Sequence, residues 1–193
     1  MRSFSLELGR NIATLIGFVG LMWFVEIVDL LLFRGTLDSF GIRPRDPDAL
    51  SGILFAPFLH RGVLHLIGNT VPLLVLGWLV IVRRRLDFFL VTAIVAILGG
   101  LGVWLFGRPN TIHIGASTLV FGYLGFLLLR AWFERSITAM LIALIAGLLY
   151  GSALWGVLPT GGRISWEGHL FGFAGGGAAA SAFRLRRVRG GWH

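Results

Sequence analysis

Long apolar runs alternate along this chain with short polar connections that carry most of its arginines. Six of these runs reach roughly twenty residues, which is long enough for a helix to cross the hydrocarbon core of a bilayer. They lie near residues 11–33, 63–82, 86–106, 113–130, 136–158 and 166–184. Because little chain remains between them, the pattern predicts an all-α membrane protein in which residues 1–193 form a single transmembrane domain of six helices.

The composition agrees with a membrane protein, since 56% of the residues are hydrophobic and only 13% are charged. The first apolar run follows Arg2 and Arg10, is long, and has no small-residue cleavage site at its end, so it predicts a retained signal anchor. The chain has no cysteine, which excludes disulfides and thiolate metal sites.

All basic charge comes from arginine, and the arginines sort by side of the predicted helices. Eleven fall on the side of the two termini and six on the other, which by the positive-inside rule places both termini in the cytoplasm. We therefore expect a multi-pass protein of a cell membrane, the inner membrane of a bacterium. The net charge of +8 does not indicate a nucleic-acid partner, because the arginines form no stripe with aromatic residues. Anionic lipid headgroups are the better partner for them.

In this topology the second, fourth and sixth helices all begin at the outer face, and polar side chains cluster at those beginnings. Three distant segments thus bring imidazole, amide and hydroxyl groups to a similar depth below one membrane surface. The residues are His60, His65, Asn69, His113, Ser117 and His169.

Small residues offer a way to bring these segments together. They recur every four residues along the sixth helix and also occur along the fourth, so the two helix backbones can approach closely. The residues are Gly168, Gly172, Gly176 and Ala180 on the sixth helix and Gly115, Gly122 and Gly125 on the fourth. Such packing would place Ser117 within hydrogen-bond reach of His169. The alternative is that the glycines serve helix packing alone.

A serine paired with a histidine is the arrangement that nucleophilic catalysis requires. Serine becomes a competent nucleophile when a neutral histidine such as His169 removes its proton. Attack on a carbonyl then creates an oxyanion, which needs hydrogen-bond donors already aimed at it. His65 and Asn69 lie four residues apart and share one helix face, so both can supply such donors. The backbone amide of Ser117, near a helix N-terminus, is a third candidate.

These residues together resemble the rhomboid family of intramembrane serine proteases. The stretch FLHRGVLHLIGN has the family's spacing of two histidines and an asparagine. Gly115-Ala116-Ser117-Thr118 is similar to the family's glycine-x-serine-glycine motif, and the aromatic four residues after the serine is Phe121. The family's histidine followed by two glycines corresponds to His169, Gly172 and Gly176.

The resemblance implies a Ser117–His169 dyad without a cofactor, and an oxyanion hole formed by His65, Asn69 and Ser117. It also implies substrates that are single-pass or other transmembrane proteins, cleaved in a site that opens to the outer face. The residues expected to support this site are His60, Gly115, Thr118, Phe121, Gly172 and Gly176.

Two features depart from the family pattern. Thr118 stands where glycine usually follows the nucleophile, and its β-branched side chain is expected to narrow the space beside Ser117. The loop of residues 35–59 is short and lacks a tryptophan–arginine pair, so we expect a bacterial type with a short first loop. Thr118 supports an alternative, a rhomboid-like pseudoprotease that binds transmembrane clients without cutting them. A small transporter is disfavoured, because no inverted repeat is detectable.

The remaining polar residues are expected to have structural roles. Glu26 and Asp29, one turn apart in the first helix, are expected to pair with Arg43 or Arg45. His113 is expected to anchor its loop, and His60 either to bond loop backbone or to line a water cavity. No metal site is predicted, because the histidines lack carboxylates at ligand spacing. The sequence leaves the oligomeric state open, and His193 has no visible partner.

Overall fold

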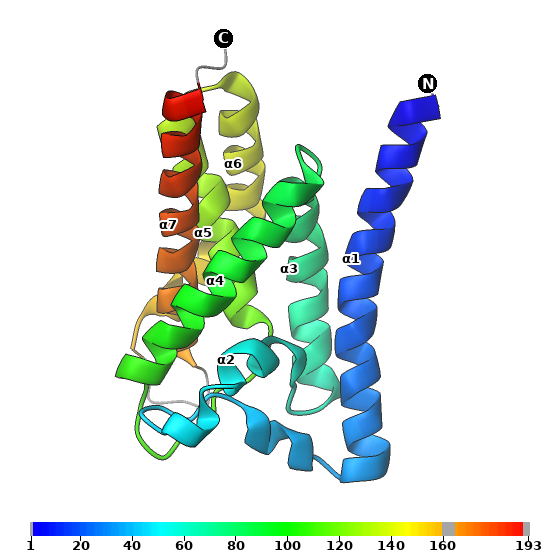
Figure 1. The fold of residues 1–193 in the computed structure, drawn as a ribbon, viewed down its shortest axis with the longest axis vertical. Helices are drawn as coiled ribbons and strands as arrows, with labels where there is room; N and C mark the ends of the chain where they lie inside the picture. Colours follow the sequence, from blue (N-terminus) through cyan, green and yellow to red (C-terminus); the bar gives the residue numbers. More distant parts are fainter. Residues whose placement is uncertain (1, 160–164, 191–193) are drawn as a thin grey trace.

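The computed structural model describes residues 2–159 and 165–190 and is built from helices, which confirms the all-α prediction (Figure 1). The long helices are α1 (Arg2–Val28), α3 (Val63–Ile81), α4 (Arg85–Phe106), α5 (Ser117–Glu134), α6 (Ile137–Tyr150) and α7 (Trp166–Gly190). Shorter elements are a π-helical turn (Asp29–Phe33), α2 (Gly52–Phe55) and 3-10 helices at Thr36–Phe40, Pro47–Ala49, Ala56–Phe58 and Gly151–Val157. In the described residues the only pairing of β type is an isolated bridge between Ile42 and His113.

Four segments of the described chain are long and apolar enough to cross a membrane. They are Ser5–Phe33, Val63–Ile81, Arg85–Phe106 and Ile137–Val157. The other two predicted spans are present as the helices α5 and α7, but α5 carries Arg130 and Glu134 and α7 is rich in glycine and alanine. The span count of six therefore stays a prediction.

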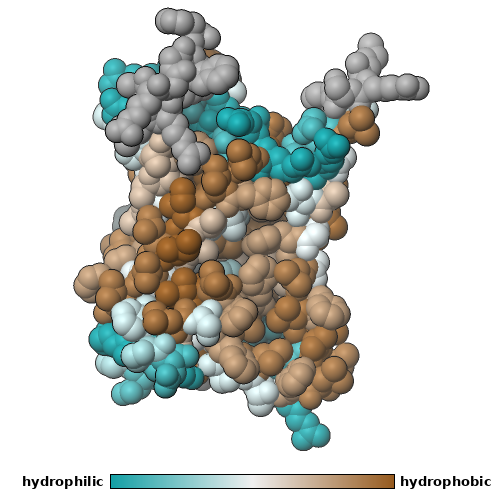
Figure 2. All heavy atoms as spheres, viewed as in Figure 1, coloured by the Kyte–Doolittle hydropathy of each residue, from teal (hydrophilic) through white to brown (hydrophobic). Residues whose placement is uncertain are grey.

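The surface of the molecule fits a membrane protein. Hydrophobic side chains cover the middle of the visible face, and hydrophilic ones gather at its two ends (Figure 2). Many large apolar side chains are exposed, among them Leu64 at 86% and Leu148 at 79%. Exposure on this scale is costly in water and suits contact with lipid.

The two ends of the bundle differ in what they hold. α1 begins and α7 finishes at one end, together with the α3–α4 and α5–α6 connections, and we call this the terminal end (Figure 1). α3, α5 and α7 begin at the opposite end, which also holds residues 34–62 and 107–116; we call this the loop end. The polar residues singled out above thus belong to the loop end.

α5 is the central helix, and α7 packs most extensively against it and against α4. The glycines of α7 allow this approach, because a Cβ at Gly172 would overlap the backbone carbonyl of Thr118 and a Cβ at Gly176 that of Gly122. The core around α5 includes the fully buried rings of Tyr123 and Phe88. Close backbone packing therefore holds together the two helices that carry Ser117 and His169.

One predicted helix boundary was wrong. The helix predicted at 113–130 begins only at Ser117, because His113 exchanges backbone hydrogen bonds with Ile42 and because Gly115 has a φ of +107°. The span predicted at 136–158 is present as Ile137–Val157, and its last part, from Gly151, is 3-10 helix. The short loop of residues 35–59 contains α2 and three short 3-10 helices.

The predicted pairing of Glu26 and Asp29 with loop arginines was also wrong. Glu26 Oε1 accepts a hydrogen bond of 2.9 Å from the Gly62 N–H, and Asp29 Oδ1 accepts one of 3.0 Å from the Leu37 N–H. The loop arginines have partners nearer at hand, since Arg43 bonds Asp46 and Arg45 bonds the Leu105 carbonyl. The two carboxylates instead accept hydrogen bonds from backbone N–H groups of the loop that have no helical acceptor.

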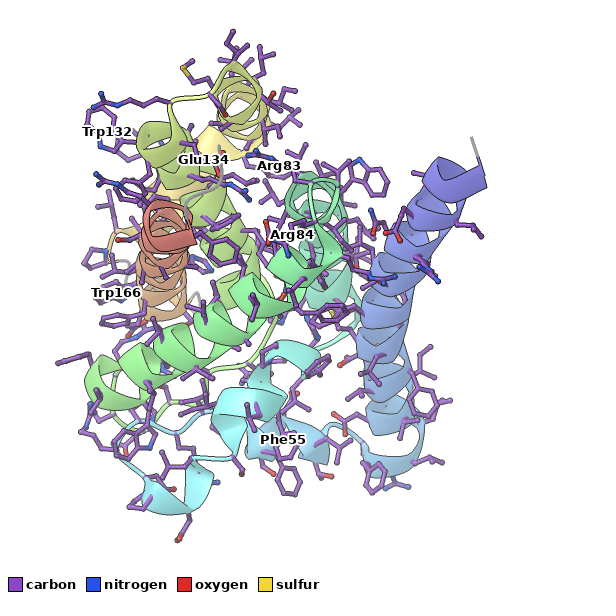
Figure 3. The ribbon with its side chains drawn as sticks, turned by 45° about the horizontal axis from the view of Figure 1, so that its top comes forward. Phe55, Arg83, Arg84, Trp132, Glu134 and Trp166 are labelled. Carbon is purple, nitrogen blue, oxygen red and sulfur yellow. The ribbon has the colours of Figure 1, made fainter. Side chains whose placement is uncertain are left out.

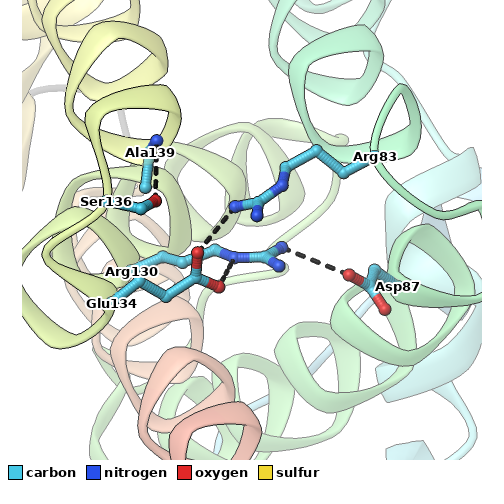
Figure 4. A network of polar contacts seen from close by, with 6 residues as sticks. All are labelled: Arg83, Asp87, Arg130, Glu134, Ser136 and Ala139. Atoms are coloured by element: carbon cyan, nitrogen blue, oxygen red, sulfur yellow. Dashed lines mark hydrogen bonds and ion pairs between the residues drawn. The ribbon is translucent and has the colours of Figure 1, made fainter. Parts of the chain in front are cut away.

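At the terminal end, four charged side chains form one network (Figure 4). Arg83 Nη1 donates to Glu134 Oε2 at 2.7 Å, and Arg130 bonds both Glu134 and Asp87. Arg83 and Glu134 point towards one another from different segments (Figure 3). Arg83 and Arg130, both among the arginines predicted to lie on the cytoplasmic side, are therefore neutralised by carboxylates within this network, and Arg10 pairs with Glu7.

Candidate active site

A cavity of about 620 Å³ opens at the loop end between α3, α5, α7 and the 3-10 helix after α6. Ser117 and His169 both line it, as do His65 and Asn69, so the fold brings the predicted nucleophile, base and donors to one place. Phe121 lines it as well. His60, Gly115, Thr118, Gly172 and Gly176 do not line the cavity and act on it only through the residues they touch.

The segment before Ser117 is fixed by backbone contacts with the first loop. The Gly115 N–H donates to the Ala56 carbonyl at 2.8 Å, and the Ala116 N–H donates to His60 Nε2 at 3.3 Å. Gly115 also passes close to His65, since a Cβ there would lie 2.7 Å from His65 Cε1. Only glycine satisfies both this contact and the positive φ. As the first residue of α5, Ser117 presents an N–H with no intrahelical acceptor.

His169 is held in one orientation by two contacts. Its ring stacks on Phe121 with centroids 4.0 Å apart and an interplanar angle of 7°. Its Nδ1 lies 2.9 Å from the Gly156 carbonyl oxygen, which can only accept a hydrogen bond. Nδ1 therefore carries the proton, and Nε2 is left with the lone pair that a general base needs. No hydrogen bond joins Ser117 to His169 among the described residues.

The contacts of His65 also select one tautomer. Its Nδ1 accepts a hydrogen bond of 3.2 Å from the Arg61 N–H, so the proton of the neutral ring is on Nε2. Asn69 Nδ2 donates one of its two N–H groups to the His65 carbonyl at 3.1 Å, which leaves the second for another acceptor. A Cβ at Gly115 would lie 2.8 Å from His65 Nε2 and 3.5 Å from Asn69 Nδ2. Two donors thus converge beside the Ser117 segment.

His60 serves the backbone and stays out of the cavity. It is 1% exposed, and its Nε2 accepts the Ala116 N–H. Burial, and secondarily the nearby His65, lowers the pKa of His60 to about 4, so the ring is neutral at physiological pH. Of the two interpretations offered for it, bonding to loop backbone is the one that the geometry supports.

Thr118 points away from the cavity into the helix packing. A Cβ on Gly99 of α4 would lie 2.7 Å from the Thr118 methyl carbon, and one on Gly168 of α7 would lie 2.9 Å from its hydroxyl oxygen. The Thr118 side chain therefore does not narrow the space beside Ser117, contrary to expectation. Thr118 fills space that the glycines leave between α4, α5 and α7.

His113 anchors its loop to the start of α7, as expected. Thr111 Oγ1 donates to the Arg108 carbonyl, so it must accept from His113 Nε2 at 2.8 Å. His113 Nδ1 is then free of hydrogen and accepts from Ser165 Oγ at 2.6 Å, while Ser165 Oγ in turn accepts the Gly168 N–H. Burial lowers the pKa of His113 and keeps the ring in this neutral form.

Several residues of the site were missed from sequence. Gly156 fixes the His169 tautomer, and Ser165 Oγ accepts the Gly168 N–H just before α7. Tyr150 and Ala153 line the cavity. Gly156 lies in the last turn of the 3-10 helix Gly151–Val157, where carbonyl groups lack an intrahelical donor, and its carbonyl meets His169, a partner far along the chain that the local pattern does not identify. Within residues 2–159 and 165–190, no three metal-ligating side chains gather. His193 lies outside the described residues.

Comparison with known proteins places the chain in a family. Residues 47–186 match the Rhomboid domain. The chain is 45% identical over 175 residues to proteins of Mycobacterium bovis and Mycobacterium tuberculosis, across 86% of its own length and 72% of theirs. A Mycobacterium leprae protein is 43% identical over 175 residues, 69% of its length. These relatives are described as uncharacterized proteins, so they add no activity. The chain belongs to the rhomboid family, whose members are generally intramembrane serine proteases.

Proposed function

We propose that this protein is a serine endopeptidase that cleaves transmembrane proteins within the membrane, with Ser117 as nucleophile and His169 as general base. The observation that carries the proposal is the tautomer of His169. The Gly156 carbonyl holds the proton on Nδ1 and leaves the lone pair on Nε2, and His169 lines the same cavity as Ser117. A histidine that served packing alone would not need this arrangement.

In the proposed reaction, His169 Nε2 takes the Ser117 proton as Oγ attacks a substrate carbonyl. The oxyanion receives hydrogen bonds from His65 Nε2–H, from the second Asn69 N–H and from the Ser117 backbone N–H. His169 then protonates the leaving amine, and a water molecule activated by the same nitrogen hydrolyses the acyl enzyme. The neutral tautomers of both histidines fit these roles before substrate binds.

The topology is part of the proposal. Six spans would place both termini at one face, and the start of α1 and the end of α7 do lie at the same end of the molecule (Figure 1). With the terminal end in the cytoplasm, the cavity opens to the outer face and the arginines of the terminal end meet anionic lipid. Residues 1–193 then form a single domain, with the short first loop of residues 35–59 beside the cavity.

Substrates follow from the chemistry of a helix in a membrane. A transmembrane helix hides its carbonyls in its own hydrogen bonds, so it must unwind before Ser117 can reach one. Substrates should therefore carry helix-weakening residues near their outer ends. The cavity, which is mostly apolar apart from the residues named above, suits one extended segment.

A pseudoprotease that binds clients without cutting them is the second candidate. The observation in its favour is the missing hydrogen bond between Ser117 and His169. Thr118 no longer supports it, because that side chain lies in the helix packing and not beside the nucleophile. Catalytic hydrogen bonds are often long in proteins without substrate, which favours the protease.

Cleavage in reconstituted vesicles separates the two candidates. The purified protein would be mixed with a single-span substrate that carries a glycine or proline near its outer end, and with a matched substrate whose helix is uninterrupted. We expect cleavage of the first substrate only, and none with Ser117→Ala. Equal cleavage by the wild type and Ser117→Ala would overturn the proposal, and binding of the first substrate without cleavage would support the pseudoprotease.

A further inference from the structure

α1 lies outside the matched Rhomboid domain, yet it places a buried carboxylate against the segment that carries the predicted oxyanion-hole histidine. Glu26 is 2% exposed in a largely apolar segment, with one other buried carboxylate, Asp29, a turn further on. Burial of a carboxylate is costly, so its hydrogen-bond partners identify what it stabilises.

The partner of Glu26 is backbone next to His65. Glu26 Oε1 accepts the Gly62 N–H at 2.9 Å. The adjacent Arg61 N–H donates to His65 Nδ1 at 3.2 Å. Two consecutive N–H groups thus connect a carboxylate of α1 with the imidazole of α3, and Gly62 has a φ of +90°, which holds the turn between them in a conformation that favours glycine.

We propose that Glu26 is a positioning residue for His65, and this inference rests on the proposed function. By holding Gly62, Glu26 orients the neighbouring Arg61 N–H towards His65 Nδ1 and so keeps the proton of His65 on Nε2, where it can stabilise the oxyanion. Without Glu26, the turn loses this constraint and His65 can adopt the other tautomer. The ring would then offer a lone pair where the reaction needs a donor.

Asp29 provides a matched control within the same helix region. It lies one turn after Glu26, is 3% exposed, and also accepts a backbone N–H of the loop, that of Leu37 at 3.0 Å. In the described part of the chain, Leu37 neither bonds to His65 nor lines the cavity. Loss of Asp29 therefore reproduces the structural cost of removing a buried carboxylate without the proposed effect on the imidazole.

Kinetics of Glu26→Ala, Glu26→Gln, Asp29→Ala, His65→Ala and the double variant Glu26→Ala/His65→Ala test the proposal. We expect Glu26→Ala to lower kcat about tenfold or more with little change in KM. Glu26→Gln, which keeps an oxygen acceptor, should recover most of the rate, and Asp29→Ala should stay near the wild-type kcat. Added to His65→Ala, Glu26→Ala should slow cleavage no further. Additive losses, or an equal loss in Asp29→Ala, would overturn the proposal.

A second readout needs no activity. Nitrogen NMR of the histidine-labelled protein in detergent reports which ring nitrogen carries the proton. For His65 we expect the Nε2–H tautomer in the wild type and in Asp29→Ala, and a mixed or reversed signal in Glu26→Ala; an unchanged tautomer in a folded Glu26→Ala protein would refute the inference. If the wild type cleaves nothing while the tautomer still depends on Glu26, the proposed function fails and the positioning role stands.

Discussion

The two ends of the bundle handle buried polar groups in different ways. At the loop end, the carboxylate of Glu26 and the imidazoles of His60 and His113 bond to backbone groups and hydroxyls beside a cavity of about 620 Å³, and the ion pair of Arg108 with Glu167 lies among them. At the terminal end, two arginines and two carboxylates bond one another, and the cavity beside them measures about 10 Å³ (Figure 4). The loop end keeps its imidazole rings uncharged, with His65 and His169 lining a cavity. The terminal end joins its helices through ion pairs.

This difference predicts how substitutions at each end should behave. Removing one member of a buried charge pair leaves its partner uncompensated, so the terminal end should govern stability. Groups that hold neutral histidines in one tautomer contribute little net free energy of folding, so the loop end should govern rate. Stability and activity should therefore separate by location in the molecule.

The largest expected effect is on rate at the loop end. His169→Ala and Ser117→Ala should each lower kcat by about 10³-fold or more, because nucleophile and base act as a unit. The double variant should be no slower than either single variant. Cleavage assays would measure the rates. Thermal unfolding in detergent would measure the stability, which we expect to stay near the wild-type value. Independent, multiplying losses would contradict a dyad.

The next effect is on stability at the terminal end. Arg130→Met removes the cation shared by Asp87 and Glu134 and should lower the free energy of unfolding by about 3 kcal/mol. The kcat of the folded fraction should stay unchanged, since the network lies at the opposite end from Ser117. A denaturant titration combined with active-site counting would measure both quantities. A fall in kcat at constant stability would show that the two ends are not separate in this sense.

Thr118→Gly tests whether this residue belongs to packing or to chemistry. Because its side chain fills the space against Gly99 and Gly168, we expect a loss of about 1–2 kcal/mol in stability from the helix and packing terms. The rate should change little. A gain in kcat or in serine reactivity would instead show that Thr118 restrains the nucleophile.

The smallest effect concerns pH at the loop end. Burial, with the nearby Asp29 and Glu26, raises the pKa of Asp38 to about 6 from an ordinary value of 3.8. The folded state thus favours the protonated carboxyl, so ionisation destabilises the fold above pH 6 and this cost disappears as the pH falls towards 4. Asp38→Asn should be more stable than the wild type by about 1 kcal/mol at pH 8 and equal to it near pH 4. Unfolding curves at both values would measure this, and a gain that persists at pH 4 would contradict it.

The sequence predicted helices, and the residues around the cavity, because both depend on local pattern. Apolar runs locate α3 and α4 within a residue or two, and the spacing of His65 and Asn69 places both on one helix face. The start of α5 was missed because the bridge of His113 to Ile42 joins segments far apart in the chain. A helical pattern in residues 113–116 carries no trace of that partner.

Contacts that fix tautomers were beyond the sequence for the same reason. The Gly156 carbonyl lies at a helix end and meets His169 from another segment, and the Arg61 N–H reaches His65 only through a turn. The predicted partner of Glu26 was wrong because an opposite charge was expected, whereas in the fold Glu26 accepts a hydrogen bond from a backbone N–H. Buried charge in a membrane helix signals a partner without identifying it.

The most direct test of the central claim is labelling of the detergent-purified protein with a fluorophosphonate probe, followed by mass spectrometry of the modified peptide. The account predicts modification of Ser117 in the wild type and none in Ser117→Ala or His169→Ala, with unfolding temperatures unchanged. A folded wild type that stays unlabelled, or a His169→Ala variant that labels as fast as the wild type, would contradict a serine activated by His169.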